Sequence, residues 1–178
     1  MAWQTADSRI VYENPWISVR EDAVVGPGGP GIYGVVTMRH PAVFVVAVDD
    51  EERVCLVTLE RYTTGRSVEV PAGGTDGEDP LTAARRELRE ETGLQAEEWT
   101  PLGTMNALNG VTVAPEHVFL ARGLSVADAA DARAEEGIDD VSWVRFDEVL
   151  RMIADGRITD GETVAAIAYA AIRLGRFQ

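Results

Sequence analysis

The chain has 178 residues, with 30 acidic and 16 basic side chains and a formal net charge of −14. All of the basic residues are arginine. The acidity argues against a nucleic-acid lattice, because nonspecific binding needs a basic surface, and against an anionic membrane surface, which repels an acidic protein. It leaves a nucleotide substrate open, since a divalent cation can bridge carboxylates to phosphate. We therefore expect a small-molecule partner, with no nucleic acid and no membrane.

The hydrophobic content of 46 % and charged content of 26 % are typical of a folded globular protein. Cys55 is the only cysteine, which excludes an internal disulfide and fits a reducing compartment. The N-terminal residues lack the basic and apolar regions of a signal peptide. The longest apolar run, residues 42–48, is too short to span a bilayer. These features favour a cytoplasmic protein.

The N-terminal part of the chain predicts a small antiparallel sheet. Polar and apolar residues alternate over residues 9–25, which predicts short strands broken at Asn14 and Pro15. The Gly- and Pro-rich residues 26–31 predict a turn or loop, and residues 33–38 predict a further strand. We expect these strands to pair with one another.

Two apolar, β-branched runs, residues 43–48 and 54–59, predict buried strands. The acidic residues 49–52 lie between the two runs, so we expect the strands to form a hairpin. Four further runs predict strands at residues 68–70, 99–107, 117–121 and 141–146.

Helices are indicated at three places. Asp79, followed by proline, predicts a helix start, and Gly93 predicts the end of the same helix. Residues 146–154 have the pattern of an amphipathic helix. Thr159 and Glu162 resemble a capping box for a last helix. The order of elements predicts a β-rich body with a few helices, an α+β or α/β sandwich.

The first predicted helix carries Glu87, Glu90 and Glu91 at the i, i+3 and i+4 spacing at which helical side chains meet. Like charges at this spacing destabilise a helix, and the dipole disfavours anions in its last turn. A divalent cation such as Mg²⁺ or Mn²⁺ would offset both effects, because hard cations prefer carboxylate oxygens. The alternative is an ordinary solvated helix, since arginines are interleaved with the glutamates.

The segment that contains this helix resembles the Nudix box, whose pattern is G-x5-E-x7-R-E-U-x-E-E-x-G-U with U aliphatic. The matching residues are Glu78, Arg86, Glu87, Leu88, Glu90, Glu91, Gly93 and Leu94. Gly73 lies five residues before Glu78, one fewer than the pattern requires, which indicates a loop shortened by one residue. The motif is long, so a chance match is negligible.

The resemblance implies a Nudix α/β/α sandwich with a mixed sheet, preceded by a small N-terminal antiparallel sheet. Residues 1–40 would form an N-terminal β-strand region for dimerisation and base binding, and residues 41–178 the hydrolase domain. The implied activity is metal-dependent hydrolysis of a nucleoside diphosphate that is linked to another moiety.

The resemblance also implies a metal site. Glu87, Glu90 and Glu91 would hold Mg²⁺ (or Mn²⁺), with the carbonyl of Ala72 as a backbone ligand. Such ions neutralise pyrophosphate oxygens and hold a water for in-line attack.

Four further residues of this segment have expected roles. Arg86 would orient the carboxylates through charge-assisted hydrogen bonds. Glu78 would support the loop and the start of the helix. Glycine at positions 73 and 93 would permit, respectively, close backbone approach and the end of the helix.

The residues around the box resemble those of ADP-ribose pyrophosphatases. By this resemblance Arg61 would contact phosphate, and Trp16 and Tyr33 would sandwich the nucleobase across a homodimer interface. Arg39 would reach phosphate or ribose. The alternatives are ordinary aromatic strand residues for Trp16 and Tyr33 and a solvated side chain for Arg39.

An acidic loop at Glu135 and Glu136 resembles the loop that supplies a catalytic glutamate in the same subgroup. A carboxylate there could position or deprotonate the attacking water. The pattern favours Glu136 over Glu135, and Glu90 of the helix is a third candidate for the base.

The function that the sequence predicts is hydrolysis of the pyrophosphate bond of ADP-ribose or a related nucleoside diphosphate sugar, with a nucleoside monophosphate and a sugar phosphate as products. Two alternatives remain open at this point. One is a Nudix enzyme that removes nucleoside triphosphates or dinucleotides. The other is a catalytically silent Nudix module that senses a nucleotide.

Overall fold

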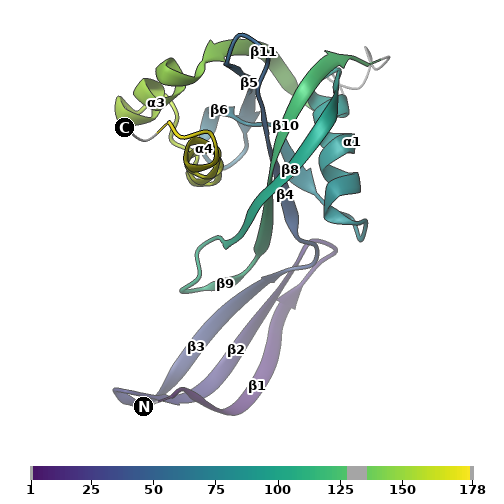
Figure 1. The fold of residues 1–178 in the computed structure, drawn as a ribbon. Coiled ribbons are helices and arrows are strands. Elements are labelled where there is room, and N and C mark those ends of the chain that lie inside the picture. The colour runs from purple at the N-terminus through teal and green to yellow at the C-terminus, as the bar shows by residue number, and fades with distance from the viewer. Residues whose placement is uncertain (1, 128–135, 177–178) are drawn as a thin grey trace.

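The computed structural model describes residues 2–127 and 136–176. Within these residues the strands form three sheets, and the helices lie on both sides of the central sheet (Figure 1). The helices are α1 (Pro80–Thr92), α3 (Phe146–Ala154) and α4 (Gly161–Arg173). The strands are β1 (Gln4–Glu13), β2 (Ile17–Gly26), β3 (Gly29–Met38), β4 (Ala42–Ala47), β5 (Arg53–Arg61), β6 (Gly65–Glu69), β7 (Ala72–Gly74), β8 (Leu94–Asn106), β9 (Thr112–Val113), β10 (Pro115–Val126) and β11 (Ile138–Arg145).

The N-terminal sheet has the strand order β1-β2-β3-β9 and extends away from the rest of the molecule (Figure 1). Its first three strands are antiparallel, as the alternation predicts. The loop expected over residues 26–31 is a tight turn, because Gly26 already pairs with Gly29. The short strand β9 joins the sheet parallel to β3, with Val36 opposite Thr112. The division of the chain into domains at residues 40 and 41 stays a prediction.

The central sheet has the order β7-β4-β10-β8, with β4 and β10 parallel and the other pairs antiparallel. Alternate residues of β4 are buried on opposite faces, because successive side chains of a strand point to opposite sides. One face contributes Val43, Val45 and Ala47 to a core that includes Leu88 of α1. The other face contributes Phe44 and Val46, with Val48 beyond the strand end, to a core that includes Ile167 of α4.

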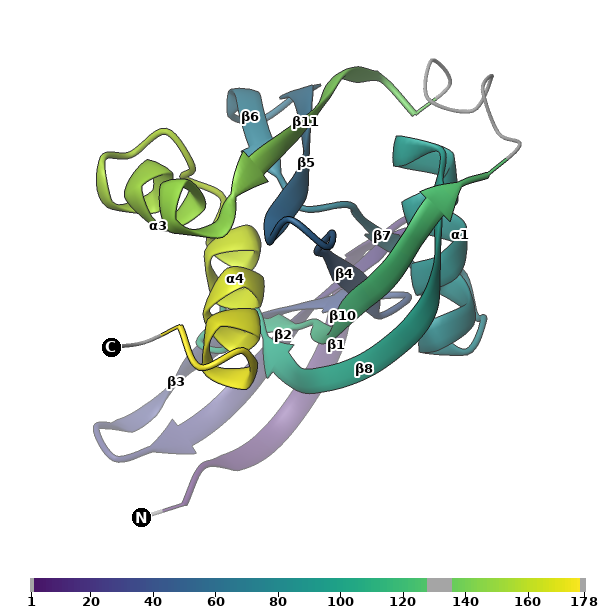
Figure 2. The same cartoon turned by 45° about the horizontal axis from the view of Figure 1, so that its top comes forward.

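The two cores place helices on both faces of the central sheet, which Figure 2 shows with α1 on one side and α3 and α4 on the other. The α/β/α sandwich that the resemblance predicts is thereby confirmed. None of the described helices has the length and apolar character that crossing a bilayer requires.

Two local predictions are wrong. The strands at residues 43–48 and 54–59 exist, but they do not form a hairpin: β4 pairs with β7 and β10, whereas β5 lies in the separate sheet β11-β5-β6. Only an isolated bridge from Val48 to Val54 joins them. Apolar periodicity reports which faces of a strand are buried and not which strand lies beside it.

The second correction concerns the last helix. Its N-cap is Asp160, whose side chain accepts a hydrogen bond of 2.7 Å from the backbone N–H of Thr163, rather than Thr159. The hydroxyl of Thr163 accepts a hydrogen bond of 3.1 Å from the N–H of Val70, which fixes the start of α4 beside the connection between β6 and β7.

Candidate active site

Helix α1 positions the acidic residues of the site. The Asp79 side chain accepts hydrogen bonds from the N–H groups of Leu81 and Thr82, at 3.1 and 3.2 Å, and so caps the helix start. Gly93 ends the helix in the left-handed conformation, with φ of 72°, and its N–H donates to the Arg89 carbonyl at 2.8 Å. The helix boundaries that the sequence predicts are confirmed.

The three glutamates of α1 differ in burial. Glu87 and Glu91 are each only 5 % exposed, whereas Glu90 is half-buried. Burial raises the pKa of Glu91 to about 8, helped by the charges of Glu87 and Glu136 and opposed by its hydrogen bond from Ala72 and by the charge of Arg61. Burial likewise raises the pKa of Glu87, against the nearby charge of Arg86.

Arg86 holds the acidic residues together. Its Nε donates to Glu78 at 3.0 Å, and its Nη1 donates to Glu87 at 2.7 Å and to Glu90 at 3.1 Å. Its Nη2 donates to the backbone carbonyl of Gly74 at 2.8 Å. One guanidinium therefore fixes two helix carboxylates relative to the loop before the helix. Its bonds to the carboxylates are charge-assisted, which makes them stronger than neutral hydrogen bonds.

The backbone of β7 lies directly against these carboxylates. The N–H of Ala72 donates to Oε2 of Glu91 at 2.9 Å. A Cβ atom at Gly73 would lie 2.2 Å from Cδ of Glu87, so only glycine lets the strand pass this close to the helix. Ala72 and Gly73 thus form the contact between the acidic helix face and the rest of the site.

The donor set suits a hard divalent cation. Buried carboxylates with raised pKa values would regain favourable energy if a cation neutralised them, and Mg²⁺ keeps several waters, so it needs few protein ligands. In the described part of the chain, no three His, Cys, Asp or Glu side chains converge on one point as they do around a bound ion. Arg86 contacts Glu87 and Glu90 instead, and a cation would have to compete with it.

The position of the predicted catalytic loop is described only in part. Glu136 is exposed and close enough for its charge to raise the pKa of both Glu87 and Glu91. Glu135 lies outside the described residues. The structure therefore brings one of the two loop candidates toward the helix carboxylates.

A cavity of about 620 Å³ opens beside β7. Ala72 and Gly73 line it, and they are the residues of β7 that lie against Glu91 and Glu87, whereas α1 itself contributes no lining residue. Trp16 and Arg61 are the two predicted substrate residues that line the cavity. Its size is within the range of small-molecule sites. Trp16 keeps 70 % of its surface exposed and is free to contact a ligand.

Arg61 is held in a bidentate ion pair with Glu69, with Nε to Oε1 at 3.0 Å and Nη2 to Oε2 at 2.5 Å. Glu69 is buried and also lines the cavity. The hydrogen bond to Glu69 is the main reason that the pKa of Arg61 lies above its usual value. Its position at the cavity fits a phosphate contact, but the guanidinium already has a partner.

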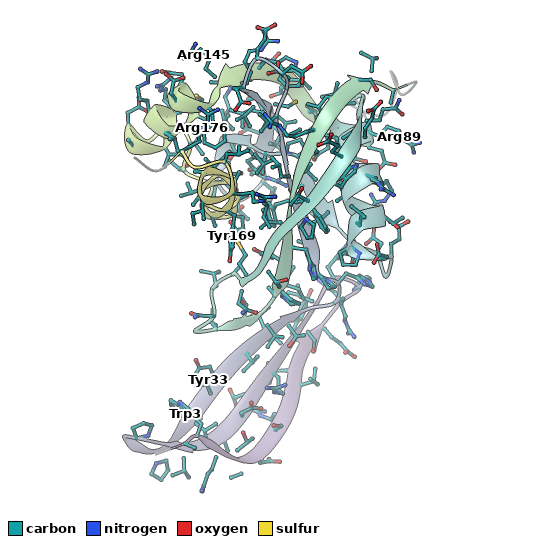
Figure 3. All side chains as sticks on the ribbon, in the orientation of Figure 1. Trp3, Tyr33, Arg89, Arg145, Tyr169 and Arg176 are labelled. Carbon is teal, nitrogen blue, oxygen red and sulfur yellow. The ribbon has the colours of Figure 1, made fainter. Side chains whose placement is uncertain are left out.

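The other two predicted substrate residues do not line the cavity. The Tyr33 hydroxyl donates to the carbonyl of Gly110, and its ring packs edge-on against Trp3 with 5.5 Å between centroids. Figure 3 shows both rings on the N-terminal sheet, away from the body of the molecule. Arg39 pairs with Glu13 at 2.9 Å. The predicted roles of Tyr33 and Arg39 stay predictions. The role of Tyr33 in base binding requires a second copy of the chain, because it is predicted across a homodimer interface.

Five acidic residues that the sequence did not predict for the site line the cavity: Glu69, Asp76, Glu116, Asp160 and Glu162. For Glu116 a signal was available. Alternate residues of β10 lie on one face, and Glu116 shares this face with the apolar residues Val118 and Leu120, which are buried. The alternation therefore indicates a carboxylate on a buried face. For Asp160 and Glu162 the sequence indicates only the start of a helix.

Two family models and several known proteins match this chain. The model of the NUDIX domain matches residues 38–167, and the model of the nucleoside diphosphate sugar hydrolase N-terminal domain matches residues 3–36. An ADP-ribose pyrophosphatase of Mycobacterium tuberculosis is 33 % identical over 168 residues, which covers 93 % of this chain and 81 % of that protein. A methanol dehydrogenase activator of Bacillus methanolicus is 32 % identical over 169 residues, which covers 93 % and 91 %.

The solved structure of an ADP compounds hydrolase shares the fold, with a TM-score of 0.84 over 98 % of this chain and 95 % of that one, at 18 % identity. The family model covers most of the chain, and the M. tuberculosis relative is aligned over nearly all of it. The chain therefore belongs to the Nudix hydrolase family, as its helix motif predicts.

Proposed function

We propose that the protein hydrolyses the pyrophosphate bond of ADP-ribose or a related nucleoside diphosphate sugar, giving a nucleoside monophosphate and a sugar phosphate. The observation that carries this proposal is the backbone of β7, which lines a cavity together with Arg61 and Trp16 and binds Glu91 of α1 through the N–H of Ala72. The relative from M. tuberculosis that bears the name ADP-ribose pyrophosphatase supports the same substrate class.

Nudix hydrolases generally need a divalent metal, and we propose Mg²⁺ or Mn²⁺ for this chain. Glu87, Glu90 and Glu91 would hold it together with the carbonyl of Ala72. When bound, the cation supplies charge neutralisation for the pyrophosphate and a lowered pKa for water. The observations in favour are the burial of Glu87 and Glu91 and their raised pKa values.

The remaining roles belong to side chains of this chain. Arg86 keeps the carboxylates in place through its four hydrogen bonds. Glu136 is our candidate for the group that positions or deprotonates water, because its charge acts on both buried glutamates; Glu90 remains the alternative. Arg61 binds a phosphate oxygen beside its pair with Glu69, and Trp16 stacks on the base.

The first prediction concerns turnover. In a panel of ADP-ribose, nucleoside diphosphate sugars, dinucleotides and deoxynucleoside triphosphates with Mg²⁺ or Mn²⁺, we expect the diphosphate sugars to be cleaved fastest, to a monophosphate and a sugar phosphate. Glu87→Gln and Glu91→Gln should each lower kcat at least about 100-fold, since charge stabilisation by a metal is worth several kcal/mol.

Glu97→Gln is the matched control for this experiment, because Glu97 is an exposed acid on β8. It should keep the activity of the wild type. Unchanged turnover in both helix variants would rule out the carboxylate metal site. Ligand binding without turnover would instead support the silent sensing module.

The second prediction concerns stability of the metal-free protein. The pKa of Glu91 is about 8 in the folded chain against an ordinary value of 4.5. Between these pH values the folded state binds more protons than the unfolded state, so the free energy of unfolding should fall as the pH rises from 5 to 8. Glu91→Gln should make this slope shallower, with the remainder arising from Glu87 and Glu116, whose pKa values are also raised.

Urea unfolding in a chelator at several pH values measures this slope, and Glu97→Gln is again the control. Added Mg²⁺ should stabilise the wild type more at pH 8 than at pH 6, because binding displaces a proton. An equal slope in the wild type and in Glu91→Gln would show that Glu91 does not titrate in this range.

The third prediction concerns base recognition. Trp16→Ala should raise the KM for ADP-ribose about tenfold, since stacking of one base on an aromatic ring contributes about 1–3 kcal/mol. Tyr62→Ala is the matched control: Tyr62 is fully exposed, follows Arg61 in the chain and does not line the cavity. An unchanged KM in Trp16→Ala would remove Trp16 from the binding site.

We also propose a homodimer built through the N-terminal sheet. Strand β1 is exposed along its whole length, and the sheet leaves large apolar side chains in contact with water. Such a concentration of apolar surface is typical of an interaction site. These side chains include Trp3, Ile10, Tyr12 and Ile32.

The fourth prediction tests this assembly by light scattering. The wild type should have about twice the monomer mass of 19.3 kDa, and the pair Ile10→Glu and Ile32→Glu should shift it to the monomer. Ile172→Glu, an equally exposed apolar residue on α4, should leave the mass unchanged. A monomeric wild type would overturn the dimer and the cross-subunit role of Tyr33.

A further inference from the structure

Glu116 is a buried carboxylate without a donor in the described chain. It is only 6 % exposed, and its Oε2 makes no hydrogen bond there, although Glu116 lines the cavity. An unsatisfied buried polar atom costs free energy comparable to a lost hydrogen bond. A ligand that brings a donor to Oε2 would recover that cost.

Two further carboxylates, at the start of α4, are close enough for their charges to affect Glu116. Asp160 is the N-cap of this helix, and Glu162 lies in its first turn, so the helix itself accounts for both positions. No such account exists for Glu116, which lies on a strand. Burial and the charges of Glu162 and Asp160 together raise the pKa of Glu116 to about 7.

The sheet register gives the position of Glu116 relative to Gly74, the cavity residue whose carbonyl binds Arg86. Ala42 lies opposite Gly74 on one side and opposite Glu116 on the other. Glu116 is therefore two strands from Gly74, or roughly 10 Å. A pyrophosphate held near Gly74 would have its substituent within reach of Glu116.

The cationic groups of the cavity do not cancel this charge. Among the lining residues the one arginine is Arg61, and its charge is already paired with Glu69 through Nε and Nη2. His40 also lines the cavity, but it is not among the charges that shift the pKa of Glu116. The wall formed by Glu116, Asp160 and Glu162 therefore keeps an excess of negative charge.

We propose that this wall, formed by Glu116, Asp160 and Glu162, selects the group that lies beyond the pyrophosphate by its charge. It favours a moiety that carries an ammonium group, accepts an uncharged polyol and rejects a carboxylate or an additional phosphate. This inference rests on the proposed function, because it assumes a nucleoside diphosphate derivative in the cavity.

The physical reason is the supply of donors. An ammonium group brings several N–H donors and a positive charge, so it satisfies Oε2 of Glu116 and reduces the repulsion among the three acids. A hydroxyl group supplies one donor and no charge. A carboxylate supplies neither and adds like charge at short range in a partly desolvated site.

The experiment compares three substrates that differ only at C6 of the sugar: ADP-6-amino-6-deoxyglucose, ADP-glucose and ADP-glucuronate. We expect kcat/KM to fall in this order, by at least tenfold from the first to the last. Glu116→Gln and Glu162→Gln should each compress this range to about threefold or less. Glu98→Gln removes the same charge from an exposed position on β8 and should leave the range unchanged.

The outcomes separate the two proposals. Equal kcat/KM for the three substrates in the wild type overturns the selection by charge and leaves the proposed hydrolysis standing. If the differences in kcat/KM among the three substrates persist in both Glu116→Gln and Glu162→Gln, other residues determine the preference, and the inference is also overturned. Hydrolysis of none of the three, with ADP-ribose also untouched, removes the proposed function and this inference together. Circular dichroism of each variant confirms that the comparison is made between folded proteins.

Discussion

The constraint on which the site depends is the burial of two carboxylates, Glu87 and Glu91, between α1 and β7. Such groups lose hydration, and their pKa values rise unless a partner supplies charge or donors. Arg86 supplies charge and a donor to Glu87, and the N–H of Ala72 supplies a donor to Glu91. The glycine at position 73 is required because a side chain there would overlap Glu87. The burial of these two carboxylates therefore explains the positions of the helix, the strand and the arginine, and the divalent cation that we propose would neutralise the charge that remains.

The cavity is formed by residues of neighbouring strands of the central sheet. Strand β4 carries β7 on one edge and β10 on the other, so the backbone beside the Nudix helix and the buried Glu116 lie across one strand from each other. Helix α4 closes the same space with its N-terminus, held by the hydrogen bond between Val70 and Thr163. By our two proposals, hydrolysis and the choice of leaving group would depend on different elements, so specificity could vary while α1 stays the same.

Local chemistry explains which features could be predicted. The bounds of α1 follow from Asp79 and Gly93, because caps act through adjacent backbone groups. The buried strands follow from their apolar runs, but the partner of β4 does not: the predicted hairpin with β5 is wrong, since strand pairing is decided by long-range packing. In the same way Asp160, rather than Thr159, caps the last helix, because the choice between neighbouring caps depends on where the chain enters the helix.

The sequence by itself determined the family, the helix that carries the carboxylates and the position of Arg86 next to Glu87 and Glu90, because all of these lie within one short segment whose spacing is fixed by the helix. Only the tertiary structure decided which other residues share the cavity. It brought Trp16 and Arg61 to the cavity and left Tyr33 and Arg39 outside it within one chain. It also placed Glu116 beside the start of α4, two elements that are far apart in the sequence. The physical reason is that contacts of this kind arise from sheet register and core packing, which no local pattern encodes.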